Sequence, residues 1–522
     1  MTNAFLRVAA SVLALALAVF AAVARAEIVQ FSVPAGVPHS DDFAVKVRNP
    51  GGEWHDLFEY AAQVDMRNVR TASMVTFDFS GTVEVSVTHN RGRIETARIR
   101  PLSAGVMPTV KGNTLTFTLT KPCNLSVEVN GDMFHNLHVF TNAPETDVPD
   151  PKDPNVIYVG PGVHTFAGTL DLGVDRVVNG QFGTQSVAAS VIDVPSGKTL
   201  YLAGGAIVKA AIRVRGAENV RIRGRGILLE GREGVQVVHS KNVTIDDLIL
   251  IDPQHYTVFG GDVHGLTIRN LRAFSCRGNA DGIDLMSSTD VLIEGVFLRN
   301  SDDTIALYNH RWDFYGDTRN ITVRNSTLWA DVAHPIHLGT HGNPAQPAVL
   351  EHLVFSNIDI LEHNEPQLDY QGCMSINVSD ENLARDIRFE DIRIDDFTEG
   401  QLVNLRVAYN KKYCTAPGRG IEDITFKNIS YTGTHANISI IEGYDDARAI
   451  KRIVFENLTI NGREISWRMD KPGYYPVWDM GKIYVGPHVE GVEFLPAGGA
   501  RPPPPPPAHP RPNAQPPAPL SP

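Results

Sequence analysis

The sequence has little of several features that would point to other classes of protein. Its four cysteines (Cys123, Cys276, Cys373 and Cys414) are too few in 522 residues for a disulfide scaffold. Basic residues are outnumbered by acidic ones, 47 to 59, which gives a formal net charge of −12. Because nucleic-acid binding needs a basic footprint, this balance argues against a nucleic-acid partner. It also makes a strongly acidic polymer a less natural substrate.

The cysteines and histidines follow no metal-binding pattern. A CxxC pair and a His-rich spacing are both absent, so the sequence predicts no metal site and no cofactor. Export would permit disulfide bonds, and Cys373 with Cys414 is the pair we consider.

Long apolar runs are confined to the first 26 residues, which read as a secretory signal peptide. Arg7 precedes the apolar stretch Val8–Val23, and Ala24-Arg25-Ala26 is a small-x-small cleavage site. The alternative is a membrane anchor, but the run is short for a spanning helix. Cleavage removes two basic residues and brings the net charge to −14. We therefore expect a soluble, secreted protein, periplasmic or extracellular, with no membrane span in the mature chain.

Residues 27–149 read as a small β-sandwich domain. Short alternating strands are separated by turn-forming residues such as Lys111-Gly112-Asn113. The predicted strands are Val75–Phe79, Val83–Val87, Leu115–Leu119 and Leu125–Val129. A Pro- and Asp-rich connector around residues 147–151 marks the boundary. At the other end, residues 497–522 are dominated by proline and predict a disordered, polyproline-like arm.

Between these segments, residues 155–495 repeat themselves. A turn residue followed by a short β pattern recurs nine times, with first apolar residues Val220, Val243, Leu266, Val291, Ile321, Leu353, Ile387, Ile424 and Ile453. Repeats of this length, each holding short strands, are typical of a solenoid. A propeller needs four longer strands per repeat, and a leucine-rich repeat needs a helical segment. The pattern therefore predicts a parallel β-helix and an all-β chain.

The repeat interval lengthens from 23 residues in the first repeats to 37 near the end. Insertions in a solenoid gather on one face and build its binding site. The growth begins at the repeats that hold three aspartates, in NADGID (279–284) and NSDDTIAL (300–307).

Strand register brings these aspartates together. The segments 282–288, 304–310 and 335–341 align so that the pairs Ile283/Leu285, Ile305/Leu307 and Ile336/Leu338 point inward. Asp281, Asp303 and His334 then occupy one position on consecutive coils, with Asp302 alongside. Neighbouring strands lie about 4.8 Å apart, so these side chains should form a ladder.

Carboxylates this close repel, which raises the pKa of one of them. Glycoside hydrolysis needs this arrangement: one acid protonates the leaving oxygen, and one carboxylate activates water. With acid and base roughly 6.5–9.5 Å apart, the water fits between them and the anomeric centre inverts. We assign Asp302 as the acid, and Asp281 and Asp303 as the residues that hold the water. His334 would tune or orient the acid by a hydrogen bond.

Other residues on the same face are candidates for substrate binding, each with an ordinary structural alternative. Asp284 and His337 either contact sugar hydroxyls or belong to an ordinary solvated face. One loop contains His310, Trp312 and Tyr315. Their aromatic faces could stack on sugar rings, or they could pack the loop itself. Arg406 and Lys412, with its neighbours Lys411 and Tyr413, either reach the far end of a cleft or are solubilising charge.

These motifs resemble those of the polygalacturonase-type glycoside hydrolases (family 28) and their relatives, the dextranases and isopullulanases (family 49). Family 28 has an Asn-Thr-Asp motif, an Asp-Asp pair and a Gly-His-Gly motif on successive coils. Here Asn279-Ala280-Asp281, Asp302-Asp303 and Ala333-His334-Pro335 match them, although both glycines beside the histidine are missing. The resemblance implies a right-handed parallel β-helix and inverting hydrolysis of O-glycosidic bonds.

One departure concerns the substrate. Family 28 enzymes that act on galacturonate carry an Arg-x-Lys motif on the next coil, but residues 372–377 here read GCMSIN and have no basic residue. Without such a partner a buried substrate carboxylate is poorly compensated. The resemblance of the two-part layout to family 49 points the same way. We therefore expect a neutral polysaccharide, such as dextran or pullulan, in preference to galacturonan.

Two other functions stay open at this point. A polysaccharide lyase is also commonly a parallel β-helix, and it needs an acidic sugar, a basic residue and often Ca²⁺. A non-catalytic carbohydrate-binding surface protein would use the solenoid to hold an extended chain. The linkage attacked, endo or exo action, and the oligomeric state are not predicted.

Overall fold

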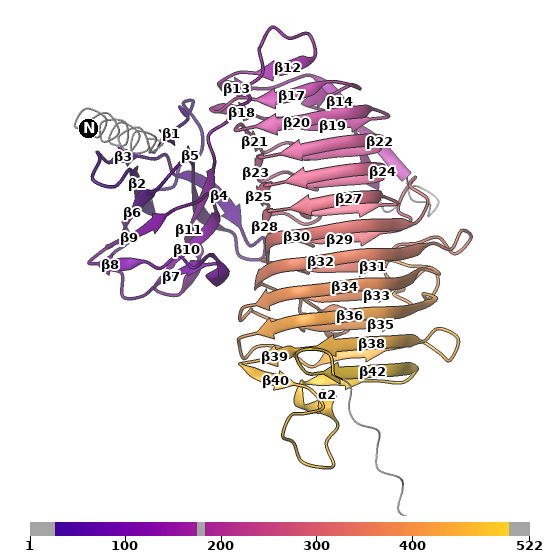
Figure 1. Cartoon of the computed structure of the whole chain (residues 1–522). Helices are drawn as coiled ribbons and strands as arrows, with labels where there is room; N and C mark the ends of the chain where they lie inside the picture. Colours follow the sequence, from indigo (N-terminus) through magenta and orange to yellow (C-terminus); the bar gives the residue numbers. More distant parts are fainter. Residues whose placement is uncertain (1–26, 175–182, 501–522) are drawn as a thin grey trace, which may run out of the picture.

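The computed structural model describes residues 27–174 and 183–500. The predicted signal peptide (1–26) and nearly all of the Pro-rich arm (497–522) lie outside these residues. The chain is all-β: a small sandwich stands beside a long right-handed parallel β-helix (Figure 1). In the described part of the chain, no helix is long and apolar enough to cross a bilayer.

The N-terminal module consists of two mainly antiparallel sheets with one apolar core between them. Alternating burial along each strand points one face of each sheet inward, and Val85 and Phe117 of one sheet meet Phe77 and Val127 of the other. The first sheet contains β1 (Ile28–Val29), β4 (Tyr60–Val64), β5 (Arg70–Phe79), β7 (Ala97–Arg100), β10 (Asn124–Val129) and β11 (Asp132–Asn142). The second contains β2 (Phe43–Arg48), β3 (His55–Asp56), β6 (Val83–His89), β8 (Thr109–Lys111) and β9 (Thr114–Leu119). The predicted sandwich is confirmed.

The rest of the chain winds into coils whose strands pair in parallel with those of the next coil. The first coils contain β12 (Val156–Val159), β13 (Gly162–His164), β16 (Val191–Asp193), β17 (Thr199–Leu202), β18 (Ala206–Val208), β19 (Ala211–Arg215), β20 (Glu218–Gly224) and β21 (Ile227–Leu229). The middle coils contain β22 (Val235–Asp246), β23 (Ile249–Ile251), β24 (Val258–Arg269), β25 (Arg272–Phe274), β26 (Ile283–Met286), β27 (Thr289–Glu294), β28 (Phe297–Asn300), β29 (Ile305–Tyr308), β30 (Thr318–Ala330) and β31 (Ile336–Gly339).

The last coils contain β32 (Val349–Glu362), β33 (Met374–Val378), β34 (Leu383–Ile394), β35 (Val403–Val407), β36 (Gly420–Tyr431), β37 (Ser439–Glu442), β38 (Ile450–Glu456), β39 (Leu458–Ile460), β40 (Arg463–Ile465), β41 (Ile483–Val485) and β42 (Val489–Leu495). A separate antiparallel pair is formed by β14 (Gly168–Val174) and β15 (Gly183–Ala189). Helical segments are short: η2 (Leu102–Ala104), η3 (Leu368–Tyr370) and α2 (Val477–Met480).

The turn residue that opens each repeat has a physical reason. Asn219, Asn242, Asp290 and Asn320 all adopt positive φ, between 53° and 59°. Asn and Asp tolerate this left-handed conformation better than other residues with a side chain, and they turn the chain into the next strand. The turn residue before each repeat therefore marks a corner of the coil, and Gly265, His352 and Arg452 hold the same position with positive φ in three of the repeats.

Stacked apolar side chains fill the inside of the coil. Rings of Phe389, Phe426 and Phe455 lie parallel in consecutive coils, with centroids 5.0 and 4.7 Å apart. The four cysteines all lie in the described residues and are free thiols. The proposed Cys373–Cys414 disulfide is therefore wrong, because the Cys414 thiol instead donates a hydrogen bond to the Thr340 carbonyl, 3.1 Å away.

The sandwich packs against the coils through both apolar and charged contacts. Met74 and Phe140 of the sandwich meet Phe274, Phe297 and Trp329 of the β-helix in one buried cluster. Beside it lies Arg299, whose side chain is fully buried. It binds Asp331 through two hydrogen bonds of 2.9 and 3.0 Å, and donates a further bond of 2.9 Å to Asn136 of the sandwich. The two modules are thus joined by a continuous core.

Candidate active site

Three consecutive strands of one sheet, β26, β29 and β31, carry the acidic motifs. Ile283 pairs with Ile305, which pairs with Ile336, and Asp284 pairs with Ala306, which pairs with His337. Since a one-residue slip would turn every side chain to the other face, this register decides the site. The observed register is the predicted one.

The residues just before these strands form the predicted row. The amide of Gly282 donates to the Asp303 carbonyl at 2.8 Å, and the amide of Thr304 donates to the His334 carbonyl at 2.7 Å. Gly282 in the NADGID motif is required by this contact between coils, because a Cβ there would lie 2.2 Å from the Thr304 carbonyl oxygen. Glycine therefore allows the first two coils of the site to approach closely.

Asp281, Asp302 and Asp303 form a compact carboxyl cluster. Each places one oxygen within 4.8 Å of an oxygen of the other two. The nearest oxygens in the cluster therefore lie closer together than the roughly 6.5–9.5 Å between acid and base that was the condition for inversion.

Asp302 is the half-buried member of the cluster. Its Oδ2 accepts a hydrogen bond of 2.9 Å from the Asn279 amide, and its Oδ1 accepts one of 3.1 Å from the Asp303 amide. Burial and the charge of Asp303 outweigh these bonds and raise the pKa of Asp302 to about 6. Asp302 therefore keeps a proton under mildly acidic conditions.

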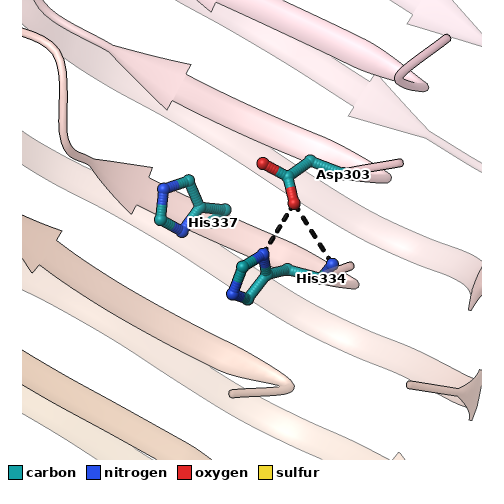
Figure 2. A group of neighbouring side chains, drawn as sticks. All are labelled: Asp303, His334 and His337. Carbon is teal, nitrogen blue, oxygen red and sulfur yellow. Dashed lines mark hydrogen bonds and ion pairs between the residues drawn. The ribbon is translucent and has the colours of Figure 1, made fainter. Parts of the chain in front are cut away.

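His334 holds Asp303 in the ionised state, the opposite protonation state to that of Asp302. The imidazole Nδ1 lies 2.6 Å from Asp303 Oδ1, and the His334 backbone amide donates to the same oxygen at 3.2 Å (Figure 2). Burial would raise the pKa of this carboxyl, but the charge of His334 and these hydrogen bonds lower it. Asp303 is consequently a carboxylate.

His334 is buried with an oxygen acceptor at each ring nitrogen. Nδ1 faces Asp303 and Nε2 faces the carbonyl of Tyr370. Burial alone would lower the pKa of His334, but Asp303 and these hydrogen bonds raise it. The hydrogen bond of His334 was expected to go to the acid Asp302; it goes to the neighbouring carboxylate instead.

Asp281 sits against a second buried acid, Asp284. Burial, followed by the charge of Asp284, raises the pKa of Asp281 well above its usual range. Burial likewise raises the pKa of Asp284, against the lowering influence of Arg311. In the described residues, Oδ1 of Asp281 and both carboxyl oxygens of Asp284 lack a hydrogen-bond partner. The free Asp281 oxygen points to a role in holding water or substrate.

Two of the predicted substrate-binding residues lie beneath the surface. Asp284 and His337 are both fully buried, which excludes the solvated face. His337 Nε2 lies 2.7 Å from Thr340 Oγ1 and 3.0 Å from the Tyr370 hydroxyl, and burial lowers its pKa to about 3. His337 is thus a neutral support for the site.

The aromatic loop packs inward instead of presenting its tryptophan. Trp312 is 3% exposed and its ring meets those of Tyr256 and Phe259 at 6.0 and 5.3 Å. Stacking of a sugar on Trp312 therefore does not fit the structure. His310 is half-buried and lies against the exposed Tyr315, with ring centroids 4.1 Å apart, so this pair keeps an open aromatic face.

Arg406 and Lys412 line a cleft of about 990 Å³ on later coils. Tyr370 belongs both to its lining and to the support of His334. Arg406 lies 3.6 Å from Asp369 and 3.4 Å from Glu442, so its charge is already balanced. The Lys412 ammonium lies 4.6 Å from the centre of the Tyr413 ring.

Two residues of the site were missed from the sequence. Tyr370 lies in a loop without a repeat pattern, and nothing local indicates that its carbonyl meets His334. Arg311 is 7% exposed and influences both Asp281 and Asp284. Its position between His310 and Trp312, which were both candidates for substrate binding, was the sequence feature that could have identified Arg311.

Comparison with known proteins agrees with these motifs. The family model described as glycosyl hydrolases family 28 matches residues 204–472, slightly more than half of the chain. The chain belongs to family 28. Among curated relatives, a polygalacturonase from Chamaecyparis obtusa is 24% identical over 220 residues, covering 40% of this chain and 38% of the relative. A probable endopolygalacturonase D from Emericella nidulans is 24% identical over 199 residues, covering 38% and 34%.

The match to these curated relatives thus spans little more than a third of their own length. Among solved structures, Dex49A from Penicillium minioluteum is similar with a TM-score of 0.54 and 12% identity, covering 89% of this chain and 96% of that chain. This likeness shows the fold. The matched 89% of this chain is more than the β-helix alone contains, so the similarity extends into the sandwich.

Proposed function

We propose that this protein hydrolyses O-glycosidic bonds in a polysaccharide, with inversion at the anomeric carbon. A single arrangement carries the proposal: a protonated Asp302, whose pKa is raised to about 6, beside an Asp303 kept ionised by buried His334. An acid and a base in different protonation states within one cluster are what this chemistry requires.

In this mechanism Asp302 gives its proton to the glycosidic oxygen while the bond to the anomeric carbon breaks. A water held between Asp303 and the free oxygen of Asp281 attacks that carbon from the opposite side. Asp303 takes the proton that the water loses. His334 acts through Asp303, since its charge keeps that carboxyl able to accept the proton.

For the sugar bound next to the cluster, we propose a neutral residue. On the strand after His337, the outward side chains are Ser375 and Asn377, and Asn377 donates a hydrogen bond of 2.6 Å to Ser375. Asn377, which lines the cleft, suits a sugar hydroxyl, and this strand offers a substrate carboxylate no cation. The nearest arginine along this row, Arg406, is engaged by Asp369 and Glu442.

Galacturonan is the second candidate substrate. The curated relatives bear polygalacturonase names, and Lys411 and Lys412 are exposed in the cleft. Reducing-sugar release from dextran, pullulan, pectate, arabinan and xylan tests the choice. Release from dextran or pullulan but not pectate is expected, and the opposite result would replace the neutral sugar by galacturonate.

The stereochemistry needs its own measurement, because the nearest oxygens are closer than in many inverting sites. Proton NMR during the first minutes of hydrolysis should show the anomer opposite to the bond that is cut. The same anomer would mean that a carboxylate attacks first. Release of no reducing sugar from any polymer, together with binding, would favour the non-catalytic alternative.

We also propose that the protein is secreted. Cleavage after Ala26 would make Glu27 the first residue, and its nitrogen lies 3.2 Å from the Ser80 hydroxyl at the start of the described fold. N-terminal sequencing of protein from the periplasm or medium should begin at Glu27. An uncleaved N-terminus in a membrane fraction would contradict this.

A further inference from the structure

The hairpin between β4 and β5 of the sandwich has a rigid tip at Asp65–Val69. Asp65 has a positive φ of 56°, and its carbonyl accepts a hydrogen bond of 3.0 Å from the Asn68 amide. The Asp65 carboxylate also accepts a bond of 3.1 Å from the Arg67 amide, and it pairs with Arg70. The tip is therefore fixed by its own contacts.

This tip lies directly against the segments that hold Asp281 and Asp302. The Met66 amide donates a hydrogen bond of 3.1 Å to the hydroxyl of Ser301, the residue before Asp302. A Cβ on Gly278 would lie 3.9 Å from the Met66 sulfur. Gly278 is followed by Asn279, whose amide binds Asp302. The sandwich thus reaches two of the three catalytic segments.

Arg67 extends the contact to the third segment. Its guanidinium donates a hydrogen bond of 3.2 Å to Asn364 Oδ1. Asn364 in turn accepts a bond of 3.0 Å from the amide of Ala333, the residue before His334. One hairpin of the sandwich therefore lies along the row Asp281, Asp303 and His334 on its upstream side.

The charge of Arg67 is available for a ligand. The side chain is exposed and, within the described residues, it forms no ion pair; its partner Asn364 is neutral. Arg406 differs, because two carboxylates balance it. An exposed guanidinium has several donors left, and these match the oxygen atoms of a sugar.

We propose that Arg67 is a specificity-determining residue of the active site, supplied by the sandwich, which donates hydrogen bonds to the saccharide chain bound beside Asp302. Its ligands are oxygen acceptors, either the hydroxyls of a neutral sugar or the carboxylate of a uronic acid. This inference rests on the proposed function, since it deepens the description of the same site. It gives the sandwich a direct part in substrate binding.

The test compares Arg67→Ala, Arg67→Lys and Asn364→Ala with the full-length wild type, in hydrolysis of the polymer that the wild type cuts and in binding of pectate, measured by affinity electrophoresis. Arg93→Ala is the matched control, because Arg93 is 76% exposed and follows β6 in the other sheet of the sandwich. KM, kcat and the melting temperature are measured for each variant. A charged hydrogen bond is worth about a factor of ten or more.

For Arg67→Ala we expect KM to rise about tenfold, with kcat and the melting temperature nearly unchanged. Arg67→Lys should recover part of the affinity, Asn364→Ala should raise KM less than Arg67→Ala does, and Arg93→Ala should leave KM unchanged. A rise of KM on a neutral polymer assigns the contact to hydroxyls. Weaker binding of pectate, with KM on the neutral polymer unchanged, assigns it to a carboxylate.

An unchanged KM for Arg67→Ala together with unchanged binding of pectate overturns the inference. An equal rise of KM for Asn364→Ala also overturns it, since Arg67 would then act only as a clamp between the modules. If the wild type cuts no polymer, the proposed function fails separately. Polymer binding measured by affinity electrophoresis then replaces KM, with the same expected order of variants.

Discussion

Nδ1 of His334 lies 2.6 Å from Oδ1 of Asp303, and the other ring nitrogen of this buried imidazole faces a backbone carbonyl. An imidazole between two acceptors keeps both protons, and its charge then holds Asp303 ionised. The pair explains how two adjacent aspartates, Asp302 and Asp303, take opposite protonation states.

Removing the imidazole should move one limb of the pH profile. In His334→Ala the pKa of Asp303 rises, so this base is protonated at a higher pH than in the wild type. The acidic limb of kcat/KM should shift upward in pH, and kcat should fall about 10²-fold or more. His352→Ala is the control, because His352 is exposed and paired with Asp386 at 2.7 Å. An unmoved acidic limb would refute the role of His334.

The alkaline limb should report Asp302. Its pKa is raised to about 6, so the carboxyl is protonated below that pH and loses its proton above it. Because the reaction needs the protonated form, kcat should fall about tenfold per pH unit well above pH 6. The measurement is kcat from pH 4 to 9 at saturating polymer. A rate that stays flat to pH 9 would exclude Asp302 as the acid.

Replacing the acid should separate catalysis from binding. Asp302→Asn lacks the proton to donate, and kcat should fall about 10²–10⁴-fold while polymer binding persists. Asp290→Asn is a matched control, since Asp290 is exposed at a corner with φ of 59° that asparagine adopts equally well. Unchanged hydrolysis by Asp302→Asn would remove the central residue of the mechanism.

A chelator distinguishes the hydrolase from a lyase. EDTA should leave reducing-sugar release unchanged, because the proposed reaction uses carboxyl groups and water and no metal ion. A metal-dependent lyase would instead produce unsaturated ends that absorb in the ultraviolet, and EDTA would abolish them. Chelator-sensitive absorbance with pectate would decide for the lyase.

The contact between the modules should carry a large part of the stability. Arg299→Ala leaves Asp331 buried without its partner, which costs about 3–5 kcal/mol. Arg452→Ala, which breaks an exposed ion pair with Asp423, should cost less than about 1 kcal/mol. Denaturant unfolding followed by fluorescence compares the two. Similar losses would show that the buried pair contributes little.

Much of this fold could be predicted because the signals are local and repeated. The corner residue of each repeat, such as Asn242 or Asp290, needs a left-handed backbone that few residues tolerate. The two-residue alternation on each strand then decides which side chains face out. These two rules predicted the register of Ile283, Ile305 and Ile336 correctly.

The sequence predicted side-chain positions less well where burial, or a loop distant in the sequence, determines them. Trp312 was a candidate for sugar stacking, but the loop folds its ring against Tyr256 and Phe259. Cys373 and Cys414 were paired from composition alone, although neither residue type nor spacing fixes the distance between them. Asp284 alternates outward from the coil, but surrounding residues cover it completely.

By itself the sequence determined the solenoid and the row of Asp281, Asp303 and His334, because period and turn chemistry are properties of adjacent residues. The tertiary structure decided the surroundings of His334, because the acceptor at its second ring nitrogen comes from Tyr370, 36 residues further along the chain. It also decided that Met66 of the sandwich touches Ser301, 235 residues away. Contacts of this kind arise from the packing of separate modules, which no local pattern encodes.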